Sequence, residues 1–415
     1  MPSFESTIDP PEDNLPRPVC RVEPAKTLIR SSECVDPWFL GRYGMNLYRG
    51  CEHACVYCDG RAERYFVSGV FDRDILVKGN AVELFQREIA RRKEPGFVFL
   101  GGGVCDAYQP VEGRFRLARG VLEVVASSGL PVHVLTKSSL VERDFDLLAR
   151  IHASAHVILS MSLQSVDEAV RRTFEPRASP VARRLETLRR AKSRGFTVGV
   201  MALPVLPGIS DRAEDIEALV GAASEVGADF LCGGSLTLRA GTQKDAYLAV
   251  IRREYPALLP GYGAAYRDEK ASGVAAARYV ERVDARFAAA SVLHGMAGRV
   301  PYSAFAGRIP LYAEVGVLIE HRAFERASVA RSDDDVGTSD ISARALAAAG
   351  WAVQRWARAR LVRVTRQRGS TYRQVEGEFR TLCRSGDLAR VIPMPERAVQ
   401  EVLAVLARVD EHRNG

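Results

Sequence analysis

Short apolar runs alternate with longer stretches of helical periodicity over the middle of the chain. The apolar runs predict strands at Phe97–Leu100, Val132–Leu135, Val157–Ser160, Thr197–Leu203 and Phe230–Cys232. The segments between them predict helices at about Phe115–Ser127, near Val141–Ile151, within Asp167–Arg194 and over Glu214–Val226. Regular alternation of this kind is typical of a parallel sheet built from β–α–β units. With roughly six such units, we expect an α/β fold whose sheet curls into a partial barrel.

Small and polar residues follow the ends of the predicted strands. They are Gly101–Gly103, Asp106, Thr136–Ser138, Ser160, Ser162, Gln164 and Pro204–Gly208. The binding and catalytic groups of parallel α/β proteins gather where strands end and the following loops begin. We therefore expect these residues to surround one functional site.

The alternation covers only part of the chain, and the sequence divides into five segments. Residues 1–36 are rich in proline and acidic residues and predict an irregular arm before a barrel over residues 37–240. Helical patterns predict an extension over residues 241–330 that packs on the barrel. An acidic linker over residues 331–340 then precedes a basic, mostly helical region over residues 341–415.

The positive charge of the chain lies in that last region. The formal net charge is +7, and residues 341–415 contain 14 arginines and 7 acidic residues, which accounts for all of the excess. The densest cluster consists of Arg355, Arg358, Arg360, Arg363, Arg366 and Arg368, close to Trp351, Trp356 and Tyr372. Arginines interleaved with aromatic residues suit phosphate contacts and base stacking. A solvated arginine-rich helix face is the alternative, and the composition leaves both open.

The composition is that of a soluble globular protein, with 47% hydrophobic and 26% charged residues. No run of 18 apolar residues predicts a membrane span, and the first residues lack the pattern of a signal peptide, so we expect a cytoplasmic protein. Five isolated cysteines show no second metal-ligand spacing: Cys20, Cys34, Cys105, Cys232 and Cys383. In a reducing compartment they are expected to stay as thiols.

Three further cysteines, Cys51, Cys55 and Cys58, form the most informative motif of the chain, C-x3-C-x2-C. Three thiolates can hold three corners of a [4Fe–4S] cluster, whereas complete ligation by protein uses four. The open iron can be chelated by the amino and carboxylate groups of S-adenosylmethionine (SAM). Two alternatives are a zinc site with His53 as a further ligand and a buried apolar helix face. The turn-forming and polar residues of the segment disfavour the helix.

The cysteine segment resembles that of the radical SAM superfamily, and Tyr57 before the third cysteine adds to the likeness. Within the superfamily, the chain is similar to the branch of spore photoproduct lyase and its relatives that resemble DNA-repair photolyases. The supporting segments are Asn46–Cys51, Cys58–Tyr65, Asp106–Pro110, Leu135–Ser138, Phe174–Pro176 and Gly199–Gly208. The resemblance covers about Tyr43 to Thr237 and implies a partial (β/α)6 TIM-like radical SAM barrel.

The resemblance also implies roles for individual residues. Cys51, Cys55 and Cys58 would bind the [4Fe–4S] cluster. The residues that it places among the contacts to SAM are Gly101, Gly102, Gly103, Lys137, Ser160, Ser162 and Tyr57. Structural alternatives exist, because a glycine run after a strand often forms only a tight turn and a strand-end Lys or Ser is usually solvated.

The implied activity is reductive cleavage of SAM at the cluster, which generates a 5′-deoxyadenosyl radical that abstracts hydrogen from an unactivated carbon. The branch implies a nucleic-acid substrate, a lyase reaction of the DNA-repair kind and a low-potential electron donor as a partner. Two other functions stay open. One is the same chemistry on a protein or small metabolite, and the other is a non-enzymatic nucleic-acid-binding protein whose fold is held by metal.

Cys105 is a candidate hydrogen donor. Spore photoproduct lyase uses a cysteine in the same glycine-rich region to return a hydrogen atom to its product. An alignment on Asp106 puts Cys105 a couple of positions from that donor and Gly103 nearer to it. The alternative is a buried structural cysteine. The offset also weakens the inference that the substrate is a thymine dimer.

Overall fold

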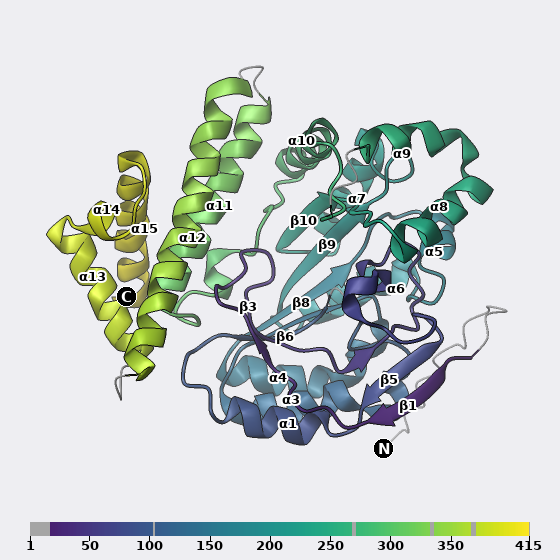
Figure 1. The fold of residues 1–415 in the computed structure, drawn as a ribbon, viewed down its shortest axis with the longest axis horizontal. Helices are drawn as coiled ribbons and strands as arrows, with labels where there is room; N and C mark the ends of the chain where they lie inside the picture. The colour runs from purple at the N-terminus through teal and green to yellow at the C-terminus, as the bar shows by residue number, and fades with distance from the viewer. Residues whose placement is uncertain (1–16, 103, 268–270, 333–335, 367–370, 415) are drawn as a thin grey trace.

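Six parallel strands form the centre of the fold (Figure 1) and confirm the predicted α/β architecture. The computed structural model describes residues 17–102, 104–267, 271–332, 336–366 and 371–414. The parallel strands are β3 (Gly41–Gly44), β6 (Phe97–Leu100), β7 (Val132–Thr136), β8 (Val157–Ser162), β9 (Thr197–Val205) and β10 (Phe230–Ser235). They lie in the order β10-β9-β8-β7-β6-β3, and β2 (Arg30–Ser31) pairs antiparallel with β3. The sheet is open between β10 and β2, which is the partial barrel expected from the sequence.

Helices cover one face of this sheet (Figure 1). The connecting helices are α1 (Ala81–Ile89), α2 (Glu112–Phe115), α3 (Leu117–Ser128), α4 (Phe145–Ser154), α5 (Glu168–Phe174), α6 (Val181–Lys192) and α7 (Ala213–Glu225). Alternate strand residues, such as Val98, Val134 and Leu159, share one apolar core with these helices. Both faces of each strand are buried, which explains why the strands are continuous apolar runs in the sequence.

The other face of the strands contributes to a second core. Phe97, Ile158, Met201 and Phe230 pack there together with residues of the C-terminal helices. These helices are α11 (Leu311–Ser332), α12 (Val336–Arg366), α13 (Tyr372–Ser385), α14 (Leu388–Val391) and α15 (Glu396–Asn414). Figure 1 shows them as a layer beside the barrel. The basic region of the chain is thus packed into the same core as the sheet.

Three helices follow the last strand: α8 (Thr242–Glu254), α9 (Leu259–Ala265) and α10 (Ala277–Leu293). Helix α10 packs on α7 and β10, and α8 contacts the 3-10 helix η1 (Asp59–Arg61) that follows the cysteine motif. These contacts bring the helical extension against the barrel and the cysteine segment. Among the described residues, no helix combines the length and apolar character required to cross a membrane.

Two segments that the sequence predicts to be irregular contain regular structure. Strand β1 (Val19–Glu23) pairs in parallel with β5 (Asp74–Lys78), which also pairs antiparallel with β4 (Tyr48–Arg49). The prediction of an irregular arm is wrong for β1 and β2, and residues 1–16 lie outside the described residues. Helices α11 and α12 occupy most of the predicted acidic linker, because α11 ends at Ser332 and α12 begins at Val336.

A buried carboxyl group lies where α11 meets the N-terminal segment. The Glu320 side chain is buried, and its Oε1 atom has no hydrogen-bond partner among the described residues. Burial, together with the nearby carboxylate of Asp36, raises the pKa of Glu320 from 4.5 to about 8, although Trp351 and Arg299 act in the opposite direction. Glu320 is therefore protonated in the folded protein at neutral pH.

Replacing Glu320 by glutamine is expected to stabilise the fold at neutral pH. The folded-state pKa lies above the unfolded value, so the contribution of Glu320 is most favourable below pH 4.5 and is lost as the pH rises toward 8. At pH 7 the raised pKa lowers the free energy of unfolding by about 3 kcal/mol, and a glutamine, which does not ionise, would remove this loss. Urea unfolding at several pH values should show a stability gain for Glu320→Gln that grows from pH 5 to pH 8. A gain that does not depend on pH would contradict this assignment.

Candidate active site

The cysteine motif forms a loop between β4 and η1, with no helix over residues 51–58. The Cys51 N–H donates to the carbonyl of Phe71 at 3.0 Å, and the Cys58 N–H returns to the carbonyl of Cys55 at 3.3 Å. Gly50, directly before the motif, has a φ of +79°, and a Cβ atom there would lie 2.8 Å from two backbone carbonyl oxygens. Turns therefore place the three side chains, and the interpretation as a helix face is wrong.

The three thiols lie close together in the protein interior. Burial raises the pKa of each thiol, to about 12 for Cys55, and charge on Cys55 or Cys58 would raise the pKa of Cys51 further. Hydrogen bonding from the backbone N–H of Asp106 acts to lower the pKa of Cys51, and that from Gly60 acts to lower the pKa of Cys58. Hydrogen bonds to cysteine sulfur are among the features that tune iron–sulfur clusters.

The donor set fits an iron–sulfur cluster. It consists of three soft thiols, the ligands that hold such clusters in proteins. In a [4Fe–4S] cluster each thiolate binds a different iron atom, so the sulfur atoms need not surround one ion. Over the part of the chain that the structure describes, no three His, Cys, Asp or Glu side chains are grouped to hold a single metal ion.

Side chains from outside the motif hold the backbone of the loop. The Arg61 guanidinium donates to the carbonyl of Cys55 at 2.9 Å, and Gln243 of α8 donates to the carbonyl of Tyr57 at 2.9 Å. Gln109 is fully buried and bonds to two backbone groups of the loop. Contacts that are distant in the sequence therefore fix the shape of the loop.

Lys137 extends from the end of β7 toward the loop. Its Nζ atom donates to Oγ of Ser162 at 2.8 Å and lies 5.8 Å from the ring centre of Tyr57. Burial alone would lower the pKa of Lys137, but Cys55 and Glu175 nearby raise that pKa above its ordinary value. The structure thus brings together three of the predicted SAM contacts, with Ser162 and Tyr57 beside the half-buried ammonium group of Lys137.

A buried ion pair between Arg184 and Glu175 lies next to Tyr57 and Ser162. Nη2 of Arg184 lies 2.5 Å from Oε2 of Glu175, and the two side chains are 0% and 1% exposed. The Tyr57 hydroxyl donates to the same carboxylate, and Arg184 also donates to the carbonyl of Ser162 at 2.8 Å. Although burial opposes ionisation, Arg184 and Lys137 lower the pKa of Glu175. The sequence did not identify either member of the pair as a site residue.

Two of the three predicted glycines lie at the end of β6, and Gly103 lies outside the described residues. A Cβ atom at Gly101 would be 2.8 Å from Cβ of Leu135, and one at Gly102 would be 2.5 Å from Oδ1 of Asn46. Close packing within the chain already favours glycine at Gly101, whereas at Gly102 a shift of the Asn46 side chain would relieve the closest contact. A contact of this strand end with SAM stays a prediction.

The two predicted serines have different surroundings. Ser160 lies on the same face of β8 as Ser162 but two residues deeper. Its hydroxyl is 2.8 Å from Nε2 of His133, whose Nδ1 lies 2.7 Å from the carbonyl of Phe39. Ser160 is thus engaged in the interior, whereas Ser162 contacts Lys137.

Cys105 is packed beside the strand that precedes the motif. Its sulfur lies 3.8 Å from Oδ1 of Asn46. Burial raises the pKa of Cys105 to about 12. These contacts are those of a buried thiol, and hydrogen donation by Cys105 stays a prediction.

Gln164 was placed at a strand end by the sequence but given no role. It lies two residues beyond Ser162 and is 2% exposed, and both polar atoms of its carboxamide lack hydrogen-bond partners among the described residues. An unsatisfied buried polar group costs about 1–3 kcal/mol. A ligand that bonds to the carboxamide would remove this cost. Gln164 therefore fits a polar ligand such as SAM at this edge of the sheet.

Replacing Gln164 by leucine is expected to stabilise the free protein by about 1 kcal/mol, because it removes a buried amide that has no hydrogen-bond partner there. The same change should weaken SAM binding roughly tenfold to a hundredfold, because the amide would form its hydrogen bonds only in the complex with SAM. Gln354→Leu is the matched control. Gln354 is also 2% exposed, but its amide bonds to both backbone groups of Val35. The control should lose stability and keep SAM affinity, as measured by thermal unfolding and equilibrium binding. Equal behaviour of the two variants would contradict a ligand role for Gln164.

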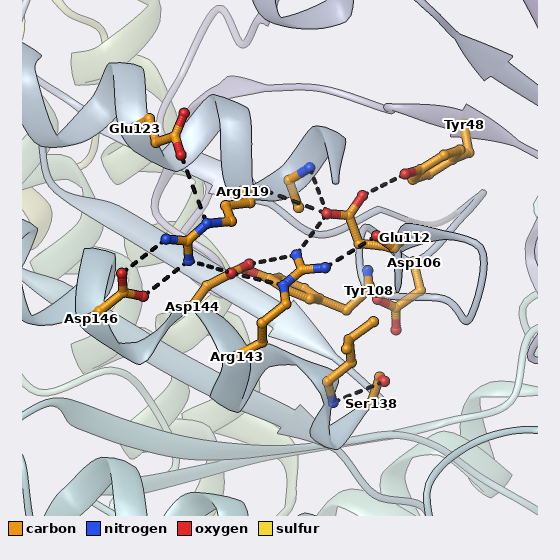
Figure 2. A network of polar contacts seen from close by, with 12 residues as sticks. Tyr48, Asp106, Tyr108, Glu112, Arg119, Glu123, Ser138, Arg143, Asp144 and Asp146 are labelled. Carbon is orange, nitrogen blue, oxygen red and sulfur yellow. Dashed lines mark hydrogen bonds and ion pairs between the residues drawn. The ribbon is translucent and has the colours of Figure 1, made fainter. Parts of the chain in front are cut away.

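A buried polar network lies behind the strand ends (Figure 2). Arg143 contacts Glu112 at 2.9 Å and Asp144 at 2.8 Å, and Arg119 contacts Asp144 at 3.0 Å. The hydroxyl of Tyr48, on the strand directly before the cysteine loop, donates to Glu112. The network thus connects the start of the cysteine loop with the segment that follows β7.

The model of the Radical SAM superfamily matches residues 45–220. The uncharacterized protein Rv2578c of Mycobacterium tuberculosis is 33% identical over 230 residues, which are 54% of this chain and 67% of that protein. The uncharacterized protein ORF301 of Acidianus two-tailed virus is 28% identical over 226 residues, which are 52% of this chain and 74% of the viral protein.

Among solved structures, spore photoproduct lyase complexed with a dinucleoside spore photoproduct is similar, with a TM-score of 0.43 and 20% sequence identity. The likeness covers 57% of this chain, and the chain spans 66% of the length of that lyase, just under two thirds.

The fold and the site together define an iron–sulfur protein built on an open parallel α/β barrel. The chain belongs to the radical SAM superfamily. It is a radical SAM enzyme, and its cofactors are a [4Fe–4S] cluster and SAM.

Proposed function

We propose that this enzyme acts on a nucleic acid, in a lyase reaction of the DNA-repair kind. The observation that carries the radical chemistry is the arrangement of three neighbouring thiols in one loop, with the Lys137 ammonium and the unpartnered Gln164 amide at the ends of strands β7 and β8. For the substrate, support comes from the excess of arginine in residues 341–415 and from the motifs shared with the spore photoproduct lyase branch.

The residues of the site have separate tasks in this proposal. Cys51, Cys55 and Cys58 would hold the cluster, while Lys137 and Gln164 would bind polar groups of SAM. When bound, the cofactors supply one-electron cleavage of a carbon–sulfur bond. Burial keeps water away from Cys51 and Cys55, and the Glu175–Arg184 pair holds the Tyr57 hydroxyl and acts on Lys137 through charge.

Exposed arginines of the C-terminal helices offer a surface for phosphate groups. Arg355, Arg373, Arg384 and Arg397 are exposed, and none of them forms an ion pair with an acidic side chain among the described residues. Arg363, Arg366 and Arg368 have side chains outside the described residues. Surfaces of this charge attract nucleic acid through release of counterions.

Other arginines of the region support a rival function on a protein or small metabolite. Arg358 lies 3.7 Å from Glu94, and Arg360 lies 2.8 Å from Glu378, so both are used within the fold. Trp356 is half-buried and packs against Phe379, with ring centres 6.0 Å apart. The predicted patch is smaller than the sequence indicates.

Charge variants of the whole chain test the substrate class. Removing residues 341–415 would expose the second core, so we propose the triple substitution Arg373→Gln, Arg384→Gln and Arg397→Gln. The control is Arg87→Gln, Arg150→Gln and Arg194→Gln, which removes the same charge from exposed positions on the outer helices and their ends. The binding of a short DNA duplex should weaken only in the first variant, and the slope of affinity against salt should fall by up to about three.

The cofactor-loaded enzyme should also convert DNA that contains a base lesion into a product of the same mass that separates from the substrate on chromatography. No DNA binding by the wild-type chain, or equal binding by both triple variants, would contradict the proposed substrate. If the wild-type chain and Cys55→Ala both bind DNA and neither converts it, a non-enzymatic binding protein would be favoured.

A further inference from the structure

The carboxylate of Asp106 lies at the junction of the cysteine loop and the end of β7. Its Oδ1 atom accepts hydrogen bonds from the Thr136 hydroxyl and the Tyr108 N–H, both at 2.8 Å. Its Oδ2 atom accepts the N–H of Lys137 at 2.8 Å and lies 3.4 Å from Nδ1 of His53, inside the cysteine motif. Figure 2 shows Asp106 beside Tyr108 at the edge of the buried network.

The same residue also acts on Cys51, the first of the three cysteines. Hydrogen bonding from the backbone N–H of Asp106 acts to lower the pKa of Cys51, whereas the negative charge of the carboxylate raises it. Asp106 is therefore the residue through which the cysteine loop, the first thiol and the backbone of Lys137 are connected. Thr136 and Lys137 are adjacent at the end of β7, so the carboxylate holds the position from which the Lys137 side chain extends.

We propose that Asp106 is a positioning residue that fixes the cysteine loop relative to Lys137 and makes the reduction potential of the bound cluster more negative. A fixed negative charge in a buried environment disfavours the addition of an electron to a neighbouring group. Cluster potentials respond to local charge and to hydrogen bonds at sulfur. A single side chain thus acts on both cofactors: on the cluster through charge, and on SAM through the placement of Lys137.

The test compares Asp106→Asn with Asp144→Asn. Asp144 is also a buried carboxylate of the same region, but its contacts are to Arg119 and Arg143 and not to the cysteine loop. After anaerobic reconstitution, the midpoint potential of the cluster is measured by a redox titration followed by electron paramagnetic resonance. We expect a shift to a more positive potential and weaker SAM binding for Asp106→Asn, and wild-type values of both for Asp144→Asn. Both variants should lose thermal stability.

Asp106→Glu is the conservative variant, since it keeps the charge. It should bring the potential back toward that of the wild type. A wild-type potential in Asp106→Asn, or an equal shift in Asp144→Asn, would overturn the proposal. If Asp106→Asn takes up no cluster, the iron content of Asp106→Glu decides. Iron content restored in Asp106→Glu would support the role of the charge, and iron content that stays low would overturn the proposal. A wild-type chain without a cluster would instead contradict the cofactor assignment itself.

Discussion

Replacing Cys55 by alanine is expected to abolish the binding of the [4Fe–4S] cluster. The motif supplies only three thiolates, and the cluster already lacks a fourth protein ligand, so two thiolates leave two irons without protein ligands. Reconstituted wild-type protein should contain about four irons and four sulfides per chain, and the variant close to none. Iron and acid-labile sulfide analysis measures this directly.

Cys383→Ala is the matched control for that experiment. Cys383 is also a buried free thiol, but it lies on α13 in the C-terminal core. Its replacement should leave the iron and sulfide content unchanged. Cluster content that survives in Cys55→Ala, or falls equally in Cys383→Ala, would disprove ligation by the C-x3-C-x2-C motif.

Replacing Arg184 by methionine is expected to destabilise the fold by about 3–5 kcal/mol, because it leaves the carboxylate of Glu175 buried without its charged partner. Methionine keeps much of the side-chain volume, so the loss should come from charge and hydrogen bonds. The free energy of unfolding from urea titration measures the effect. Arg189→Met, at a side chain that is 57% exposed and pairs with Glu186, should cost less than about 1 kcal/mol.

The double variant Arg184→Met with Glu175→Gln separates charge from packing. Removing both charges should restore roughly half or more of the stability lost in the single variant. A double variant as unstable as Arg184→Met would show that the guanidinium acts mainly through its hydrogen bonds to backbone carbonyls.

The sheet could be predicted from the sequence because its strands are short apolar runs separated by helical periods. Strand β6 has the predicted bounds, and β7, β8 and β10 differ only at their ends. Strand β9 continues through Pro204 to Val205, beyond the predicted end at Leu203. The pairing of β9 with β10 is irregular between Gly233 and Ser235, and such an irregularity accommodates a proline that cannot donate a ladder hydrogen bond.

Strand β1 was missed because its side chains are mostly exposed, so it carries no apolar pattern, and its partner β5 is about fifty residues away. Pairing of this kind depends on tertiary structure and leaves little local signal.

The cluster ligands could be predicted because their spacing is local and characteristic. The surrounding residues could not, since their roles depend on contacts between distant segments. Glu175 and Asp106 reach the cysteine loop from 118 and 53 residues away, at Tyr57 and His53. Gln164 stands out because its buried amide has no hydrogen-bond partner among the described residues. The two serines differ because Ser160 lies deeper along β8 and contacts His133, whereas Ser162 contacts Lys137. None of these properties can be inferred from residue type alone.

The most direct test of the account is the formation of 5′-deoxyadenosine from SAM by the reconstituted, dithionite-reduced enzyme, followed by mass spectrometry under anaerobic conditions. The account predicts that wild-type protein and Cys383→Ala form this product, whereas Cys55→Ala does not. A wild-type enzyme that carries its full cluster and forms no more product than Cys55→Ala would contradict it.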